Sequence, residues 1–252
     1  IMPPQPGPGP REIGTKIQRE IQNPANNIPP KFQNQVVADV TGIAAFPSLS
    51  FDAILDNNTI IPPDTHGSAG PSHLMTMLNS QVRIQTKTGT TLSTVTLASF
   101  WSPLPGSPFD PKVHYDAINS RWLAVCDVNG NSTTSKVNFA ISASSDPTGS
   151  WTYYQFDADS LESTRWADYP ALGFNSRWIA ITNNMFSVGG SFIGARMWVI
   201  DKSTALAGGA LTVTLFPTSF DLAATVSGFT LQPCITHGAD TTLYIVDNSG
   251  YA

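Results

Sequence analysis

The chain has 252 residues, a net charge of −5 and only 13 Lys and Arg, which argues against the basic surface that a nucleic-acid partner requires. No apolar run is long enough to cross a bilayer as a helix. The 20 Pro and 19 Gly residues and the many β-branched residues are typical of turns and strands. The composition therefore predicts an all-β protein that binds no nucleic acid and does not span a membrane.

The N-terminal segment, residues 1–34, is rich in Pro, Gln and Asn. Proline lacks a backbone N–H and stiffens the chain, so this segment is predicted to be an extended arm or linker. Residues 35–252 are predicted to form the folded part. Within them, Val-Val-Ala-Asp-Val at 36–40 is expected to add a strand before the first repeat.

A sequence motif that occurs twice predicts a repeated unit of strands. Each copy has Asp close to Pro, a short turn, Asn-Ser-Arg-Trp and then an alternating apolar strand. The copies comprise 110–111 with 119–122, and 168–170 with 175–178. Degenerate copies open at Pro63 and Pro233. With Pro63, Pro111, Pro170 and Pro233 as markers, subtraction gives intervals of 48, 59 and 63 residues, which fit the blades of a β-propeller with long loops.

Propeller blades are expected over residues 62–107, 108–160 and 167–216, with a fourth beginning at 231. About three and a half blades are too few to close a ring, which favours part of a six- to eight-bladed β-propeller. The ring would be completed by sequence beyond the chain, which we favour, by a partner subunit, or by the N-terminal strand. The repeat also predicts that Trp122 and Trp178 pack between neighbouring blades.

A succession of motifs over residues 50–202 resembles a family of large secreted bacterial β-propeller proteins. The motifs are PPDTHG at 62–67, GPSH at 70–73, DPKVHYD at 110–116, SDPTG at 145–149 and DYPALG at 168–173. The resemblance implies a propeller in an exported protein and implies no activity. Low charge, abundant Asn, Ser and Thr, and glycosylation-like triplets at 57–59 and 131–133 also favour a secreted, extracellular or periplasmic protein.

Three acidic residues hold equivalent places in the repeat. They are Asp64, Asp110 and Asp168, with Gln232 at the fourth place. If each begins the innermost strand of its blade, their oxygens gather at the channel mouth, and such oxygen ligands suit Ca²⁺. The alternative is that each Asp accepts backbone N–H bonds within its own turn. Asp64, Asp110 and Asp168 are thus the predicted metal ligands, and Ca²⁺ is the predicted cofactor.

The cysteines and histidines show no established catalytic or metal-binding pattern. Cys126 and Cys234 are spaced wrongly for a redox or zinc motif, and whether they pair is open. Cys126 falls in an apolar strand and is expected to be a buried core residue. His66 and His73 could meet across a turn, where histidine more often bonds to backbone than to metal.

The sequence predicts a non-catalytic extracellular module that binds a protein or glycan partner and is stabilised by calcium. The first alternative is a carbohydrate-active hydrolase, which needs two carboxylates flanking one bond, commonly with Glu as the acid. The chain has only Glu12, Glu20 and Glu162, two of them in the arm, which disfavours an enzyme. The second alternative is a structural subunit of a cell-surface or extracellular assembly, in which the Pro-rich arm reaches a neighbour.

Overall fold

The computed structural model describes residues 48–160, 163–216 and 228–247. From Leu49 onward, these residues belong to one compact unit. The arm predicted for 1–34 and the strand predicted at 36–40 lie outside the described residues, so both stay predictions. Glu162, the glutamate outside the arm that was considered as the acid of a hydrolase, also lies outside the described residues.

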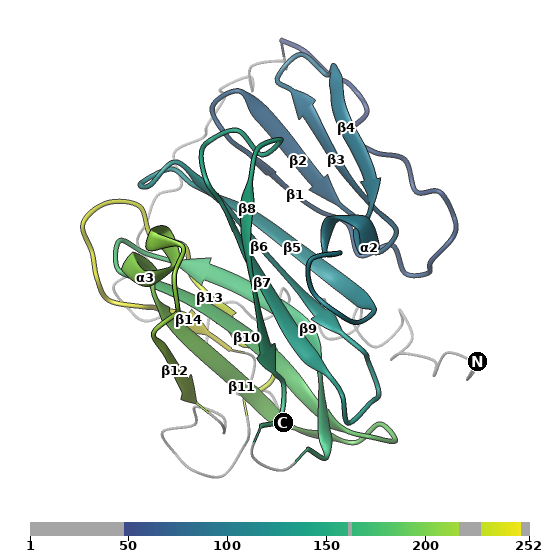
Figure 1. Cartoon of the computed structure of the whole chain (residues 1–252), viewed down its shortest axis with the longest axis vertical. Helices are drawn as coiled ribbons and strands as arrows, with labels where there is room; N and C mark the ends of the chain where they lie inside the picture. Colours follow the sequence, from purple (N-terminus) through teal and green to yellow (C-terminus); the bar gives the residue numbers. More distant parts are fainter. Residues whose placement is uncertain (1–47, 161–162, 217–227, 248–252) are drawn as a thin grey trace, which may run out of the picture. The chain divides into compact units, whose positions relative to one another are not determined.

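Three antiparallel sheets of four strands follow one another along the chain (Figure 1). The first contains β1 (His66–Ala69), β2 (His73–Met77), β3 (Gln81–Thr86) and β4 (Thr91–Thr96). The second contains β5 (Pro108–Asp116), β6 (Arg121–Val128), β7 (Lys136–Ser142) and β8 (Trp151–Asp157). The third contains β9 (Arg165–Phe174), β10 (Trp178–Ser187), β11 (Phe192–Asp201) and β12 (Val213–Phe216). A two-stranded piece of a fourth sheet contains β13 (Gln232–Pro233) and β14 (Ile245–Val246).

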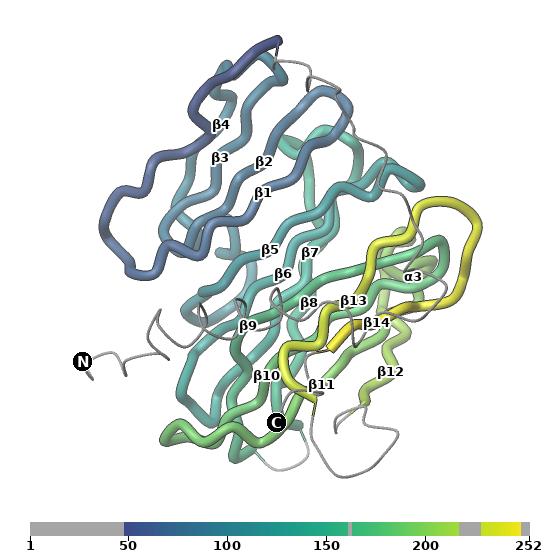
Figure 2. Tube along the Cα trace, turned by 180° about the vertical axis from the view of Figure 1, so that it is seen from behind, coloured from purple at the N-terminus to yellow at the C-terminus, as the bar shows by residue number. Residues whose placement is uncertain are grey.

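The first strands of successive sheets are neighbours, in the order β1, β5, β9 and β13 (Figure 2). Hydrogen bonds join β1 and β5: the Val113 N–H donates to Nδ1 of His66 at 3.2 Å, and the Tyr115 N–H donates to Oγ of Ser68 at 3.0 Å. Each sheet therefore presents its first strand inward and its fourth outward, which is the arrangement of propeller blades. The expected fold, three blades and part of a fourth, is confirmed.

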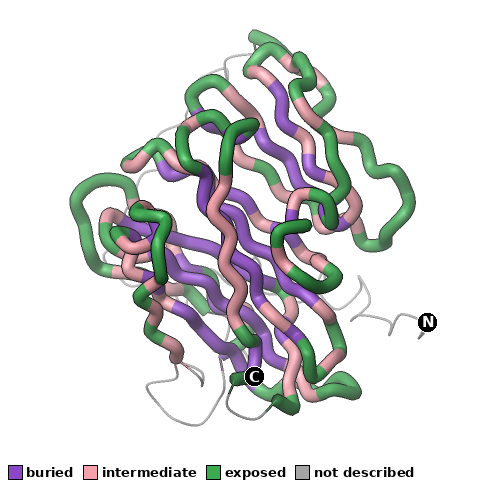
Figure 3. Tube along the Cα trace, viewed as in Figure 1, coloured by how far each residue is buried: buried purple, intermediate pink, exposed green. Residues whose placement is uncertain are grey.

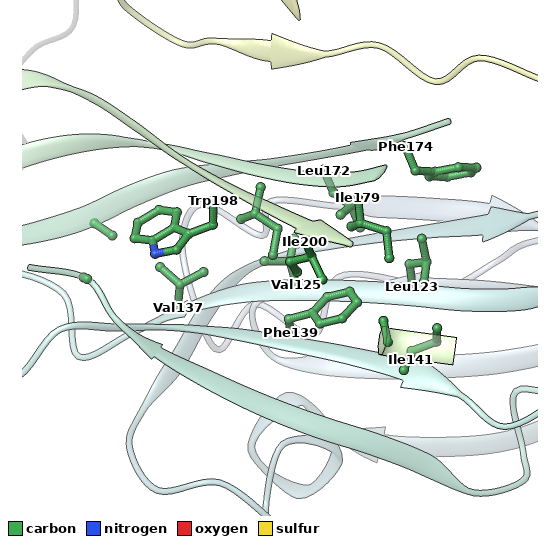
Figure 4. Packing of buried hydrophobic residues seen from close by; sticks show 14 of the residues in the cluster. Leu123, Val125, Val137, Phe139, Ile141, Leu172, Phe174, Ile179, Trp198 and Ile200 are labelled. Atoms are coloured by element: carbon green, nitrogen blue, oxygen red, sulfur yellow. The ribbon is translucent and has the colours of Figure 1, made fainter. Parts of the chain in front are cut away.

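Apolar side chains on both faces of the sheets explain this stacking. Every residue of β6 from Trp122 to Val128 is buried, and Figure 3 shows burial continuing through β7 and β10. Alternate side chains of a strand point to opposite faces. One face of the second sheet therefore packs on the first sheet around Met75, Trp122 and a fully buried Cys126. The other packs on the third sheet, where Trp198 and Ile200 lie against β6 and β7 (Figure 4).

Within the described residues, two short helices interrupt the strands, namely α2 (Leu97–Phe100) and α3 (Lys202–Ala207). α3 follows β11 directly, because Asp201 ends the strand and is the N-cap of the helix. Oδ1 of Asp201 caps the helix by accepting the Ser203 N–H at 2.9 Å. Gly208 ends it with a left-handed backbone, φ 71°.

Strand pairing aligns the third blade with the second in a way that differs by one residue from the alignment of their repeated sequence motifs. Lys112 pairs with Val125 in the second sheet, and Ala171 pairs with Thr182 at the corresponding place in the third. A bulge precedes each pair and contains a residue with positive φ. These residues are Asp110 (φ 52°) and Tyr169 (φ 57°), and similar conformations occur at the other two openings, at Asp64 (φ 45°) and Thr230 (φ 56°).

The two tryptophans consequently occupy different surroundings. Trp122 is fully buried against the first sheet, stacked edge-on with Tyr115 at 5.1 Å. Trp178 lies one position earlier in its strand, so it points to the opposite face and is half-buried. It lines a cleft together with Leu231, which precedes β13, and Ile245 of β14. Arg177 covers its ring at 4.5 Å.

A buried ion pair fastens the third sheet to the second. Nζ of Lys202 at the start of α3 lies 2.8 Å from Oδ2 of Asp116 at the end of β5, and both side chains are 2 % exposed or less. The same ammonium lies 4.6 Å from the centre of the Phe174 ring. Removing one member of such a pair leaves an uncompensated charge in the core, which is strongly destabilising.

We expect Lys202→Met to lower the free energy of unfolding by about 3 kcal/mol, because Met fills the space and leaves the Asp116 carboxylate buried and unpaired. The matched control is Lys136→Met, which removes an ion pair with Asp157 whose side chains are 30 % and 41 % exposed. That change should lower the free energy of unfolding by at most about 1 kcal/mol. Urea unfolding measures both, and equal losses would show that the buried pair is not a special link between the sheets.

Candidate functional site

Three carboxyl groups meet where the first strands of the three sheets begin. Asp64 lies two residues before β1, whereas Asp110 and Asp168 lie in β5 and β9. The Asp110 carboxyl is in hydrogen-bonding contact with the carboxyls of both Asp64 and Asp168. All three residues are half-buried. The structure therefore brings together the three acidic residues singled out in the sequence, although Asp168 reaches the cluster from one position earlier in its strand.

Asn79 links the segments that begin the first two blades, at Asp64 and Asp110. Its Nδ2 donates to Oδ2 of Asp64 at 2.6 Å and to the Pro62 carbonyl at 3.0 Å. Its Oδ1 accepts the Asp110 N–H at 2.6 Å. One buried amide thus fixes the Asp64 side chain and the Asp110 backbone together. The neighbouring N–H of Tyr169 lowers the pKa of Asp168 and so opposes part of the effect of burial.

Crowding and burial change the acidity of the cluster. Burial, followed by the contact with Asp64, raises the pKa of Asp110 to about 7 from its ordinary value of 3.8. Burial also raises the pKa of Asp168. Like charges close together disfavour ionisation, so one proton is held among the carboxyls near neutral pH.

A second group of polar residues, Asp127 and Asn183, is more deeply buried than the cluster. Asp127 in β6 is fully buried, and burial together with the charges of Asp110 and Asp168 raises its pKa well above the ordinary range. Nδ2 of Asn183 in β10 donates to both Asp127 oxygens at 2.7 Å. Oδ1 of Asn183 is buried and has no hydrogen-bond partner among the described residues. Sequence reasoning missed this pair, yet polar residues inside the apolar strands 122–128 and 178–185 were a visible signal.

Two histidines lie farther along the same strands. The rings of His66 in β1 and His114 in β5 are 5.0 Å apart and perpendicular. Burial lowers the pKa of both, and with the neighbouring His66 it lowers that of His114 to about 4. Both imidazoles are therefore neutral at pH 7. The partner of His66 is His114, whereas His73 instead lies 3.8 Å from Asp146.

The cluster has the oxygen atoms that a hard cation prefers. In the described ranges, no group of three or more His, Cys, Asp or Glu side chains surrounds a common point in the manner of a metal site. The Ca²⁺ expected at Asp64, Asp110 and Asp168 therefore stays a prediction. Cys126 and Cys234 are both free thiols and do not form a disulfide.

The separations within the cluster restrict its catalytic chemistry. Glycosidases keep their two carboxyl groups roughly 5 Å or more apart, so that a sugar, with or without a water, fits between them. Carboxyls in hydrogen-bonding contact, as Asp110 is with Asp64 and with Asp168, are closer than that. Neither contacting pair has the spacing for glycoside hydrolysis.

No family model matches the chain, and no curated protein matches it. Among solved structures, the chain is similar to a GH43 endo-arabinanase from Bacillus licheniformis, with 13 % identity and a TM-score of 0.42. The match covers 72 % of this chain and 63 % of that chain, so less than two thirds of the endo-arabinanase is represented. A likeness at this level carries no information on activity. Within the described residues, no helix is long and apolar enough to cross a membrane.

The raised pKa of Asp110 predicts a pH-dependent stability. An Asp whose pKa is raised on folding holds its proton where the unfolded chain has lost it, so this stabilisation is complete below about pH 4 and is lost as the pH rises through about 7. We expect Asp110→Asn, which suits a left-handed backbone, to weaken this fall and to be more stable than the wild type at pH 8. Urea unfolding from pH 4 to pH 8, with chelator present, measures the effect.

The control for this experiment is Asp52→Asn, at an exposed position. It should keep the pH dependence of the wild type. A wild-type pH dependence in Asp110→Asn as well would show that Asp110 does not hold the proton.

Proposed function

We propose that this chain is a non-catalytic extracellular binding or assembly module built on a β-propeller, and that Ca²⁺ bound by Asp64, Asp110 and Asp168 stabilises it. The observation that carries the proposal is the mutual contact of these carboxyls at the inner ends of three different sheets. A cation there relieves the repulsion among them and holds the three sheets together.

The residues at the cluster offer the kind of oxygen ligand that such an ion takes. Calcium takes six to eight oxygen ligands from carboxylates, amide carbonyls and water. Asp64, Asp110 and Asp168 would supply the carboxylates. The Asn183 amide lies beside the Asp168 backbone, with its Nδ2 3.5 Å from the Asp168 carbonyl oxygen. Its Oδ1 is buried and has no hydrogen-bond partner among the described residues. When bound, the ion supplies positive charge, and it would lower the pKa of Asp110 from about 7.

A carbohydrate-active hydrolase is the second candidate, and one observation favours it. A carboxyl with a pKa of about 7, as at Asp110, in contact with other carboxyls resembles the acid of an acid–base pair. The short separations within the cluster weigh against it. We therefore rank the binding module first.

The partner and location are proposed on sequence grounds. Low charge and the exported family that the motifs resemble support an extracellular or periplasmic protein that contacts a protein or a glycan. A structural subunit of a surface assembly is the related possibility, with the 1–34 arm contacting a neighbour. Deleting residues 1–34 separates the two, because loss of assembly with an unchanged melting temperature would favour the subunit.

A thermal melt with and without calcium tests the ion. At a Ca²⁺ concentration of 100 Kd, binding to the folded state alone stabilises by about 2.7 kcal/mol, which raises Tm by roughly 5 to 10 °C for a protein of this size. We expect this rise in the wild type and in Asp52→Asn, and its loss in Asp64→Asn and Asp110→Asn. A wild-type Tm that neither Ca²⁺ nor chelator changes would rule out the calcium site.

Turnover of chromogenic glycosides tests the hydrolase. We expect none above the background rate with the wild type, because no contacting carboxyl pair leaves room for the sugar. Turnover that Asp110→Asn abolishes, while Asp52→Asn retains it, would replace the binding module by an enzyme.

A further inference from the structure

A groove of about 490 Å³ lies between the outer parts of the first and second sheets, away from the carboxyl cluster. One wall is the face of β3 and β4 that contains Val82, Ile84 and Ser93. The opposite wall is β8, with Trp151 and Tyr153. Its volume lies in the range of small-ligand sites.

The aromatic rings of the groove are held in place before any ligand arrives. Phe100 of α2 meets Trp151 edge-on at 5.1 Å and Tyr153 at 5.9 Å. Nε1 of Trp151 donates to the Pro147 carbonyl at 3.0 Å, which fixes the indole. The three rings are half-buried, so part of each ring remains exposed. Preorganised rings cost little conformational entropy on binding.

Among the residues that the structure describes, the polar side chains lining the groove are hydroxyls, and none is charged. Five hydroxyl residues take part: Ser93, Ser99, Ser102, Thr148 and Tyr153. Within the described part of the chain, the hydroxyls of Ser93, Ser102 and Tyr153 make no hydrogen bond, so they are free to bond a ligand. A neutral groove offers no ion pair to a charged ligand.

We propose that this groove binds a neutral oligosaccharide. A sugar ring has apolar C–H faces, which pack on aromatic rings, and a rim of hydroxyls, which exchange hydrogen bonds with Ser and Tyr side chains. The lining offers both kinds of contact within one volume, together with an apolar rim residue, Leu92, that is 46 % exposed. The groove uses none of the cluster residues, so it is a second site that goes beyond the proposed calcium site.

Affinity electrophoresis of the full chain tests the proposal. The probes are soluble neutral polysaccharides (starch, xylan, β-glucan and arabinan), with polygalacturonate as an acidic comparison. We expect at least one neutral polymer to retard the wild type. Leu92→Lys and Ser102→Lys, which place a long charged side chain at exposed lining positions, should abolish the retardation. Tyr153→Phe keeps the ring and loses one hydrogen bond, so binding should weaken about threefold to tenfold.

The matched control is Val188→Lys, at a residue of similar exposure, 45 %, in the β10–β11 turn. It should bind as the wild type does, and thermal melts should show all four variants folded. Retardation by no neutral polymer, by polygalacturonate alone, or undiminished in both lysine variants would overturn the proposal. Asp110→Asn should bind the polysaccharide normally, so failure of the calcium site and failure of the groove are separate results.

Discussion

The structure depends on the need to cover both faces of the second sheet. Every side chain of β6 from Trp122 to Val128 is buried, and a strand that is apolar on both faces cannot lie at a surface. The first and third sheets must therefore stack on either side of it. That stacking places β1, β5 and β9 next to one another, so the acidic residues at their beginnings meet even though about 50 residues separate them along the chain. Packing of apolar faces thus creates a cluster of like charges.

The sheets and their order could be predicted from the sequence because each repeat carries turn residues and alternating strands, which are local signals. The register of the third blade could not be predicted from the sequence. Matching the letters of the repeat aligns Trp178 with Trp122, whereas strand pairing aligns Ile179 with Trp122, because both occupy the same place relative to the bulge. A single-residue difference in turn length reverses the faces of a strand, and no local pattern distinguishes the two alignments.

The candidate site also has a part that the sequence predicts and a part that it does not. The acidic openings were visible as repeated letters, and their meeting followed from blade geometry. Three further contacts depend on distances between different sheets: the bond from the Asp110 N–H to Asn79, the bond from Asn183 to Asp127, and the contact between His66 and His114. Such contacts become visible only when the packing is known. The cluster and the outer groove also differ in kind, since one is crowded with charge and the other has none.

The burial of Cys126 has a consequence for the chain's reactivity. Its thiol is fully enclosed between the first and second sheets, and burial raises its pKa well above the usual value, so reagents that attack thiolates cannot reach it in the native state. Cys234 is partly exposed. Alkylation should therefore occur in two stages, in which the slow stage follows separation of the first two blades, and the chain carries its own chemical reporter of that opening.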